Sequence, residues 1–517
     1  MRVFGILATA RSVGGCAVHR SLIRTIGHHA DAAGTERKPG TVGPLGSVLV
    51  GGVSAKSEGA VVLAQDGQAG QTGSGGVAVA VPPSLGATAV SAAAPGRGAL
   101  WGLGAGWFTT RTLLLLIVLG VLKVTSLDVT TDVSVIYHGW YEVLQTGTFP
   151  MDDVTWQYPP GAALVMLLPG LLPWSYLISF YVLCAVFDAL AIGMLVRSGM
   201  RKGRSFLGAW VWVAGVPLLG PTVYCRYDIM VTAIAVAGLL VLLRRPVLGG
   251  LLLGFGGLIK IWPLLALAGT PRGRRTRRSW TAALAALSGL AFLLAAGMNG
   301  AFQFLTFQAD RGIEVESVGA LPLHFARLFG GWHGLVSMNY GSVELLGPWV
   351  TVISKVSMAA TLAGFAWLLY WRLRARRWQP STTYDAALAT LLVFTVTSRV
   401  ISPQYLVWVV GLAAVCLTVR GTSQRPVAVM VLVATLLTTL EFPMAFGQVV
   451  NSQPWGVTVL ALRNLLLVAA TLLSCRRLWL STRGDQTATL VLPPAEQPER
   501  GYPVRPGIAY EQSLLDD

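Results

Sequence analysis

Residues 128–163 combine side chains that could act on a sugar. This segment has five carboxylates (Asp128, Asp132, Glu142, Asp152 and Asp153), six aromatic side chains and no Lys or Arg. Aromatic rings stack on the apolar faces of sugars, and a carboxylate can take a proton from a hydroxyl group. The segment directly follows an apolar run, so it is expected at a membrane surface. These residue types favour a carbohydrate site there.

Two carboxylates are candidates for the catalytic base. Asp128 and Asp132 are four residues apart, so on a short helix they would share one face. Either carboxylate could deprotonate a hydroxyl group as it attacks the anomeric carbon of a sugar. A solvated acidic loop explains the same residues equally well. Asp152 and Asp153 are adjacent but lack a third spaced ligand, so no cofactor is expected, although a divalent cation stays open.

The other residues of this segment are candidates for binding the substrate. Its aromatic rings would stack on the sugar, and Asp153 would accept hydrogen bonds from hydroxyl groups. The run from Tyr158 to Gly161 contains two prolines, which fix φ and predict a sharp helix start. The candidates are Tyr137, Trp140, Asp153, Trp156 and Tyr158.

Isolated cations elsewhere in the chain are candidates for a phosphate site. Arg399 is the leading candidate, with Arg226 and Lys260 as helpers. A guanidinium can grip phosphate oxygens with two hydrogen bonds, and ionisable groups inside apolar segments are costly. Snorkelling, or a buried pair such as Arg463 with Glu441, is the alternative reading. Further substrate-binding candidates are Arg311, Glu316, His324 and Gln404, and Asp228 is expected to cap a helix, leaving Arg226 free to face an anion.

Composition places these residues in a membrane protein. Of the 517 residues, 54% are hydrophobic and 12% are charged, which is too apolar for an ordinary soluble protein. The net charge of +16 suggests nucleic acid, but the cations form short clusters between apolar runs of membrane-spanning length. The five cysteines are scattered, so neither a structural disulfide nor a zinc site is expected.

The apolar runs predict an all-α polytopic bundle. Two of them, Pro159–Pro173 and Val247–Thr270, begin and end on the same side and contain internal breaks, so they are expected to be broken or re-entrant helices. Counting their halves differently gives about 10 to 13 transmembrane helices. Full crossings are expected near residues 109–127, 174–196, 205–220, 227–243, 279–299, 349–371, 383–398, 404–419, 426–441 and 457–475.

The distribution of arginine predicts the orientation and the domains. With both termini in the cytoplasm, every arginine cluster falls on the cytoplasmic side, as the positive-inside rule requires. Residues 1–100 have low complexity and are expected to be a disordered cytoplasmic extension. Residues 101–475 form the membrane domain, and 476–517 form a disordered cytoplasmic tail. The long outer loop, residues 299–347, is expected to act as a lid.

The order and spacing of several motifs resemble glycosyltransferase family 87, whose members are bacterial membrane mannosyltransferases of the GT-C class. The resemblance covers about residues 105–475. Further segments resemble the family at Arg226–Asp228, Gly249–Pro263, Arg311–Ser317 and Ser402–Trp408. Ile136 makes the first motif one residue longer than the family pattern. That motif reads Asp132-x4-Tyr137-x2-Trp140-x3-Leu144-x2-Gly147-x2-Pro150-x2-Asp153-x2-Trp156-x-Tyr158-Pro159-Pro160.

The resemblance implies a reaction and a base. Enzymes of this class use a polyprenyl-phosphate sugar donor, take an acid of the outer loop as base and invert the anomeric centre. The expected activity is transfer of a hexose, mannose in this family, to a glycolipid or cell-envelope glycan at the outer face of the plasma membrane. Asp132 matches the motif and is preferred to Asp128. No nucleic acid is expected as a partner.

Two other classes of function stay open. A transporter or lipid flippase would show internal repeats and several paired charges within its spans. The sequence has no clear repeat and few intramembrane charges. A membrane scaffold without catalytic activity is the third possibility.

Overall fold

The computed structural model describes residues 97–125, 127–309 and 311–483. The predicted disordered extension lies outside these residues, except for its last four positions, and so does most of the predicted tail. Helix α2 (Arg97–Val118) begins and ends earlier than the predicted first crossing. Helix α17 (Pro454–Arg483) continues beyond the predicted domain boundary at residue 475. The helical domain is therefore longer at both ends than the sequence suggests.

Helices dominate the described residues, as predicted. The short helical elements at the loop connections are η1 (Asp132–Tyr137), α3 (His138–Leu144), η3 (Gly220–Val223), α10 (Phe304–Ala309), η5 (Val318–Ala320), α11 (Leu321–Leu328), η6 (Leu440–Met444) and α16 (Phe446–Val450). The longer ones are α5 (Tyr176–Gly199), α6 (Leu207–Leu218), α7 (Asp228–Leu242), α9 (Arg274–Gly297), α12 (Val350–Arg374), α13 (Thr382–Thr397), α14 (Tyr405–Leu417) and α15 (Arg425–Thr439).

The helices identify a polytopic membrane protein. Within the described part of the chain, six helices are long and apolar enough to cross a membrane. Six further apolar segments are shorter, at 10–17 residues. A helix rises about 1.5 Å per residue, so such a segment is shorter than the ~30 Å hydrocarbon core. The 10 to 13 spans expected from the sequence therefore correspond to a mixture of full-length and short helices.

Of the two segments expected to be broken, the second is broken, whereas the first is one short helical segment, Ala162–Leu171. The first folds as α4 (Ala162–Leu167) followed by a 3₁₀ turn, η2 (Leu168–Leu171). The second folds as α8 (Pro246–Ile259) and η4 (Trp262–Gly269), separated by Lys260 in an extended conformation. Proline at the second position of η4 lacks a backbone donor, which favours this break.

These two segments meet each other. The backbone N–H of Gly161 donates to the carbonyl oxygen of Leu258 at 3.1 Å. A Cβ atom added at Gly161 would lie 2.7 Å from that oxygen, so any larger residue would push the segments apart. This contact brings the start of α4 beside the break at Lys260.

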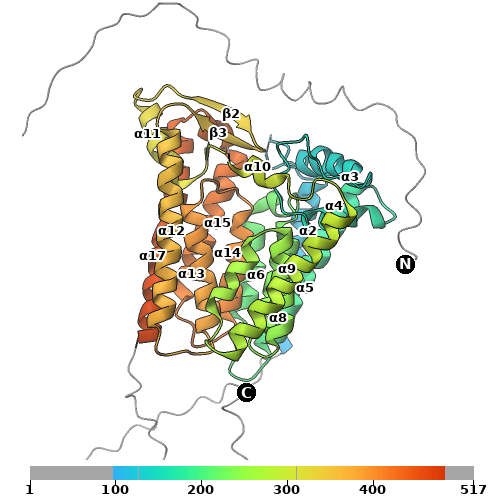
Figure 1. Cartoon of the computed structure of the whole chain (residues 1–517), viewed down its shortest axis with the longest axis vertical. Coiled ribbons are helices and arrows are strands. Elements are labelled where there is room, and N and C mark those ends of the chain that lie inside the picture. Colours follow the sequence, from blue (N-terminus) through green and yellow to red (C-terminus); the bar gives the residue numbers. More distant parts are fainter. Residues whose placement is uncertain (1–96, 126, 310, 484–517) are drawn as a thin grey trace, which may run out of the picture. The chain divides into compact units, whose positions relative to one another are not determined.

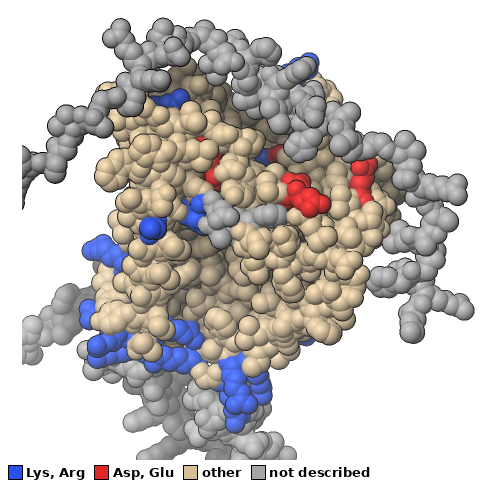
Figure 2. All heavy atoms as spheres, turned by 45° about the horizontal axis from the view of Figure 1, so that its top comes forward, with Lys and Arg blue, Asp and Glu red and all other residues tan. Residues whose placement is uncertain are grey.

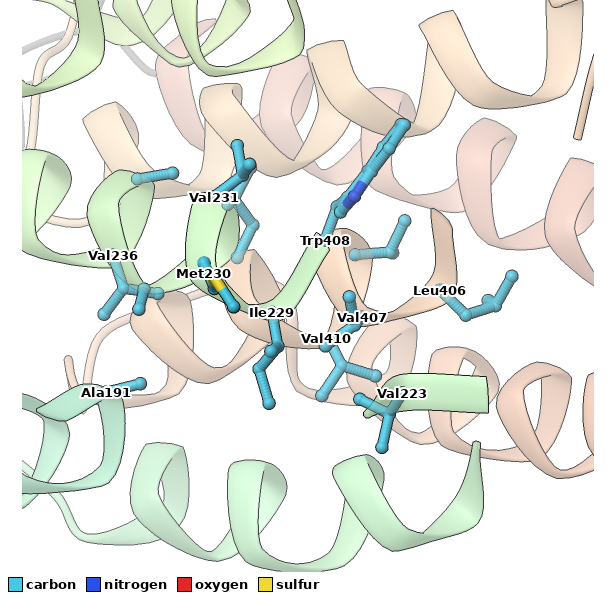
Figure 3. Packing of buried hydrophobic residues seen from close by; sticks show 14 of the residues in the cluster. Ala191, Val223, Ile229, Met230, Val231, Val236, Leu406, Val407, Trp408 and Val410 are labelled. Carbon is cyan, nitrogen blue, oxygen red and sulfur yellow. The ribbon is translucent and has the colours of Figure 1, made fainter. Parts of the chain in front are cut away.

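Long helices lie side by side and short strands cap one end (Figure 1). Helix α9 packs closely along α8, because Cβ atoms at Gly250 and Gly254 would lie 2.2 and 2.3 Å from carbonyl oxygens of α9. Small residues at this spacing let two membrane helices approach closely. Apolar side chains of α5, η3, α7 and α14, including Ala191, Val223, Ile229 and Val407, point toward one another in the core (Figure 3).

A small antiparallel sheet lies in the long loop between α9 and α12. Its strands are β1 (Ile313–Glu314), β2 (Leu335–Asn339) and β3 (Ser342–Leu346), in the order β1-β3-β2. In its register, Glu314 lies opposite Glu344, and Val336 lies opposite Leu345. The sequence predicts no strand here, since these runs are short. The loop is therefore built around a sheet within an otherwise all-α protein.

The two ends of the bundle differ in charge. We call the end with β1–β3, η1 and α3 the loop end, and the opposite end the arginine end. In Figure 2 most of the visible Lys and Arg side chains gather at the arginine end, with a few elsewhere, whereas the visible Asp and Glu side chains lie toward the loop end. The arginine clusters lie in the connections there and at the end of α17.

Candidate active site

Asp132 is the first residue of η1, a π-helical turn that α3 continues. A π-helical turn holds one residue more per hydrogen-bonded ring than an α-helical turn. Ile136, the residue that lengthens the first motif, lies within this turn. The extra residue is therefore absorbed locally, and the Asp132 side chain stays 25% exposed at the start of the helix.

Asp128 does not share a helical face with Asp132, so this expectation is wrong. Asp128 precedes η1 and is exposed. Its Oδ1 accepts hydrogen bonds from the backbone N–H of Thr130 at 2.9 Å and from the Thr130 hydroxyl at 2.7 Å. These local bonds are typical of aspartate in a turn. Asp128 therefore shapes the turn that leads into η1.

Arg226 pairs with Asp132 and is not free. The guanidinium Nη1 contacts Asp132 Oδ2 and also donates to the carbonyl oxygen of Cys225 at 3.0 Å. Burial lowers the pKa of Arg226 to about 10, against the opposing effect of the carboxylates of Asp228 and Glu316. The guanidinium therefore lies in a mostly desolvated place surrounded by three acids.

Asp228 forms a buried ion pair instead of capping its helix. It is the first residue of α7 and makes no capping hydrogen bond. Its Oδ1 accepts from Lys260 Nζ at 2.7 Å and from Trp408 Nε1 at 2.6 Å. The break between α8 and η4 thus aims the lysine at the start of α7.

Four aromatic rings surround the Lys260 ammonium group. Its Nζ lies 4.9 Å from the ring centre of Tyr227 and 5.0 Å from that of Trp408. The rings of Tyr158 and Tyr405 follow at 5.4 and 5.5 Å. These distances allow cation–π attraction, which stabilises a charge that has left water. The cage joins the loop before α4, the start of α7 and the start of α14.

Asp132, Arg226, Asp228 and Lys260 thus form two neighbouring ion pairs, which we call the charge chain. Among the described residues, no protein group forms a hydrogen bond with Asp228 Oδ2 or with the hydroxyl of Tyr227. Buried polar atoms usually have a partner. These two atoms can therefore bind a polar group of a substrate or a water molecule.

Three rings expected to stack on a sugar are buried. Tyr137, Trp140 and Trp156 are each 5% exposed or less. Tyr137 stacks on Trp140 at 5.5 Å, and Trp140 meets Trp156 edge to face at 5.1 Å between ring centres. Asp153 accepts a hydrogen bond from Trp140 Nε1 at 2.8 Å. In this structure the three rings and Asp153 hold the loop together. Of the rings expected to bind the sugar, Tyr158 is the one that lies beside Lys260.

Arg311 and Arg399 lie at the base of the loop-end sheet. Arg311 Nε contacts Glu344 Oε1 at 3.2 Å, and its Nη2 donates to the Ser342 hydroxyl at 2.6 Å. Arg399 Nη1 donates to the carbonyl oxygen of Arg311 at 2.8 Å and to the Ser354 hydroxyl at 3.3 Å. Burial lowers the pKa of Arg399, and the charge of Arg311 adds to this effect. Both arginines therefore tie strands and loops together.

Glu314, which the sequence analysis did not select, connects β1 to the loop before α14. Its carboxylate accepts from the backbone N–H of Ile401 at 2.6 Å and from the Ser402 hydroxyl at 3.1 Å. Burial raises its pKa to about 7, although Arg311 and these hydrogen bonds act in the opposite direction. Its position in the run Arg311–Ser317, which resembles the family, could have identified Glu314 as a candidate residue.

Glu316 belongs to a buried cluster with Glu441 and Arg463. Arg463 Nη2 lies 2.6 Å from Glu441 Oε2 and 3.5 Å from Glu316 Oε1, which confirms the predicted pairing of Arg463 with Glu441. Burial and the charge of Glu441 raise the pKa of Glu316. One arginine therefore faces two carboxyl groups in this buried cluster.

His324 and Gln404 are both buried in the fold. His324 Nδ1 lies 2.8 Å from the Ser452 hydroxyl, and its Nε2 lies 2.8 Å from the carbonyl oxygen of Val315. A carbonyl oxygen only accepts, so Nε2 carries the proton, and burial lowers the pKa of His324. The imidazole therefore bridges the turn at Ser452 and the backbone at Val315. Gln404 is 7% exposed at the start of α14.

The remaining ionisable groups include no metal site among the described residues and one buried ion pair, Arg111 with Asp188. In the described ranges, no group of three or more His, Cys, Asp and Glu side chains could hold a metal ion. Asp188 in α5 pairs with Arg111 of α2 at 2.7 Å and accepts hydrogen bonds from Trp212 and Tyr224. This network links three helices and is structural. The pairing of Arg111 with Asp188 could not be predicted from the sequence, because the two residues are distant along the chain.

The charge chain can bind an anion and move a proton in one place. Arg226 and Lys260 provide the positive charge, and Asp132 provides a carboxylate that solvent can reach. In the comparison with known protein families, the model of glycosyltransferase family 87 matches residues 156–403. No curated protein and no solved structure matches the chain.

Proposed function

Since the chain belongs to glycosyltransferase family 87 and is a membrane glycosyltransferase, we propose that it transfers a hexose from a polyprenyl phosphate donor. The sugar is mannose in the proposal, and the acceptor is a glycolipid or cell-envelope glycan. The anomeric centre is inverted. The reaction takes place at the outer face of the plasma membrane, which is the loop end.

The charge chain is the observation that carries this proposal. A phosphate linked to a lipid needs cations at the depth of its headgroup, and a membrane interior supplies none. Lys260 lies at the break between α8 and η4, and Arg226 lies just before α7, whose first residue, Asp228, pairs with Lys260. Lys260 is buried among aromatic rings, and Arg226 pairs with Asp132, the partly exposed member of the charge chain. A lipid phosphate can therefore meet two cations close to a carboxylate.

Asp132 is the proposed general base. Its carboxylate takes the proton of an acceptor hydroxyl while the oxygen of that hydroxyl forms a bond to the anomeric carbon. The bond between the anomeric carbon and the phosphate oxygen breaks, and the polyprenyl phosphate leaves with the electron pair. Phosphate is a good leaving group, so no acid is required on that side. General-base catalysis contributes about 10² to 10⁴ in rate.

The pairing of Arg226 with Asp132 suggests how the base becomes available. A donor phosphate competes with the carboxylate for the guanidinium, and guanidinium groups bind phosphate with two hydrogen bonds. When the phosphate takes Arg226, Asp132 loses its partner and can accept a proton. In this proposal Arg399 positions the loop before α14, and Arg226 with Lys260 binds the phosphate.

The charge distribution supports the proposed orientation. The arginine clusters gather at the end opposite the charge chain (Figure 2). Clusters of this kind stay on the cytoplasmic side of bacterial membranes and contact anionic lipid headgroups. A lipid-linked donor suits the outer side, where nucleotide sugars are hard to supply.

The experiment compares two classes of donor. The full chain in lipid nanodiscs is incubated with membrane lipids and either a labelled polyprenyl-phosphate mannose or a labelled nucleotide sugar. We expect labelled glycolipid from the polyprenyl donor alone. Transfer from the nucleotide sugar alone would overturn the proposed donor. No transfer from either would favour a transporter or a scaffold.

A further inference from the structure

A cavity at the loop end lies apart from the charge chain. It has a volume of about 450 Å³, within the usual range of roughly 300–1,000 Å³ for small-molecule sites. One wall is Leu127, directly before Asp128. The other walls come from η6, α16 and the turn after them, and are formed by Pro443, Met444, Ala445, Phe446, Gly447, Gln448, Asn451 and Gln453.

The lining excludes a charged ligand and favours a hydroxyl-rich one. It contains no Lys, Arg, Asp or Glu. Three side-chain amides, those of Gln448, Asn451 and Gln453, offer both donors and acceptors. No protein group within the described residues bonds to the amides of Gln448 and Gln453, while Asn451 uses only its Nδ2, in a bond to Gly447 at 2.7 Å. Phe446 adds an aromatic ring, as carbohydrate sites commonly do.

The rim of the cavity points to a ligand attached to a lipid. Leu127 and Met444, which line the cavity, are 39% and 54% exposed, and the residues before Leu127 in the chain include Val121, Leu122 and Val124, which are 40–65% exposed. Trp455, at the start of α17, is 60% exposed. Tryptophan is enriched where a membrane meets water, so this rim lies at the interface. An alkyl chain can therefore lie along the rim while a polar headgroup enters the cavity.

The position of the cavity relates it to the reaction. The chain runs from its wall at Leu127 into the turn at Asp128 and then to Asp132. On the other side, Pro443 follows Glu441 of the buried cluster with Arg463. A neutral headgroup in the cavity thus borders the segment that carries the proposed base, without approaching the cations that suit a phosphate.

We propose that this cavity binds the neutral carbohydrate headgroup of a lipid-linked acceptor. That the bound glycolipid is the acceptor rests on the proposed function. That the cavity binds a neutral glycolipid rests on the cavity alone. The amides of Gln448, Asn451 and Gln453 hydrogen-bond to sugar hydroxyls, and Phe446 contacts a sugar face.

Gly447 allows a direct steric test. It lines the cavity, and a Cβ added there would have no atom within 4 Å. A larger side chain therefore fills the cavity without meeting the backbone. Gly447→Trp should block the site, whereas Gly447→Ala should leave most of its volume. Gln303→Ala, at an exposed glutamine outside the cavity, is the matched control for Gln448→Ala.

The measurement is binding of radiolabelled octyl mannoside and octyl glucoside to the full chain in nanodiscs. We expect at least about tenfold weaker binding for Gly447→Trp and severalfold weaker binding for Gln448→Ala. Gly447→Ala and Gln303→Ala should bind like the wild type. Unchanged binding by Gly447→Trp, or no binding of either probe by the wild type, would overturn the inference.

A second readout separates this inference from the proposed function. Binding of a polyprenyl phosphate is measured on the same nanodiscs and should be equal for Gly447→Trp and the wild type. If hexoside binding depends on Gly447 but no polyprenyl donor is used, the proposed function fails and the cavity assignment stands. If Gly447→Trp loses both ligands equally, its effect is on the fold, and the assignment fails unless Gln448→Ala weakens hexoside binding alone.

Discussion

At the scale of single residues, the carboxylate of Asp132 competes with the donor phosphate for the guanidinium of Arg226. Asp132→Asn removes the negative charge that occupies the guanidinium of Arg226. We therefore expect this variant to bind a polyprenyl phosphate about three- to tenfold more tightly than the wild type, which corresponds to roughly 1 kcal/mol. Binding to the purified protein in nanodiscs measures this directly.

The control variants make this expectation specific. Asp128→Asn should leave phosphate binding unchanged, because Asp128 bonds only within its own turn in the described structure. In an Arg226→Gln background, Asp132→Asn should no longer tighten binding. Weaker binding by Asp132→Asn alone would mean that its carboxylate does not restrain Arg226.

The pair formed by Asp228 and Lys260 predicts a rescue. Lys260→Met leaves the carboxylate of Asp228 buried without its cation, which typically costs about 3–5 kcal/mol. Adding Asp228→Asn removes that charge, so the double variant should recover most of the lost thermal stability without regaining activity. Thermal unfolding in nanodiscs tests this. A double variant less stable than Lys260→Met would contradict the pairing.

The types of these residues were predictable, and their partners were not. Asp132, Arg226 and Lys260 stand out in the sequence because charges near apolar segments are rare. The pairing of Asp228 with Lys260 depends on the break between α8 and η4, which aims the ammonium group. The pairing of Arg111 with Asp188 depends on how α2 packs on α5. The spacing of residues in the sequence predicts neither where that break points the ammonium group nor how α2 packs on α5.

At the scale of elements, the break between α8 and η4 was predictable from glycine, lysine and proline inside an apolar run, and so was the shortness of the segment formed by α4 and η2. Their contact at Gly161 was not, since it follows from the packing of α4 on α8. The small sheet was also missed, because β1 has two residues and the strands lack a long alternating pattern. The π-helical turn at Ile136 explains the extra residue of the first motif.

The link between β1 and the loop before α14 predicts a pH effect. The pKa of Glu314 rises from 4.5 to about 7 on folding, because burial favours the protonated form. Between these values the folded protein binds more protons than the unfolded chain, so the stability from this group falls as pH rises. Glu314→Gln should flatten the decrease in melting temperature between about pH 4.5 and 7. An unchanged pH profile would contradict this role.

At the scale of the whole molecule, composition and periodicity identified an all-α polytopic membrane protein. The boundaries were less accurate, as α2 and α17 show. Helix ends are not set by hydropathy alone, since α9 begins with exposed arginines ahead of Ser279, where it packs on α8. The orientation comes from arginine alone and can be tested independently.

Labelling of single introduced cysteines tests the orientation. An impermeant reagent applied to intact cells should label a cysteine at position 152 and should label those at positions 274 and 376 only after the cells are opened. All three positions are exposed, and Cys184, Cys225 and Cys416 are buried. Labelling at position 274 in intact cells would place the arginine end outside.

The most direct test of the account is the rate of the chemical step in a single turnover. The full chain in nanodiscs, saturated with polyprenyl-phosphate mannose, is mixed with acceptor lipid, and product formation is followed for the wild type, Asp132→Asn and Asp128→Asn. We predict that Asp132→Asn slows the step by about 10² to 10⁴ while Asp128→Asn stays near the wild-type rate. A wild-type rate for Asp132→Asn would contradict the account, and the base would have to be sought elsewhere.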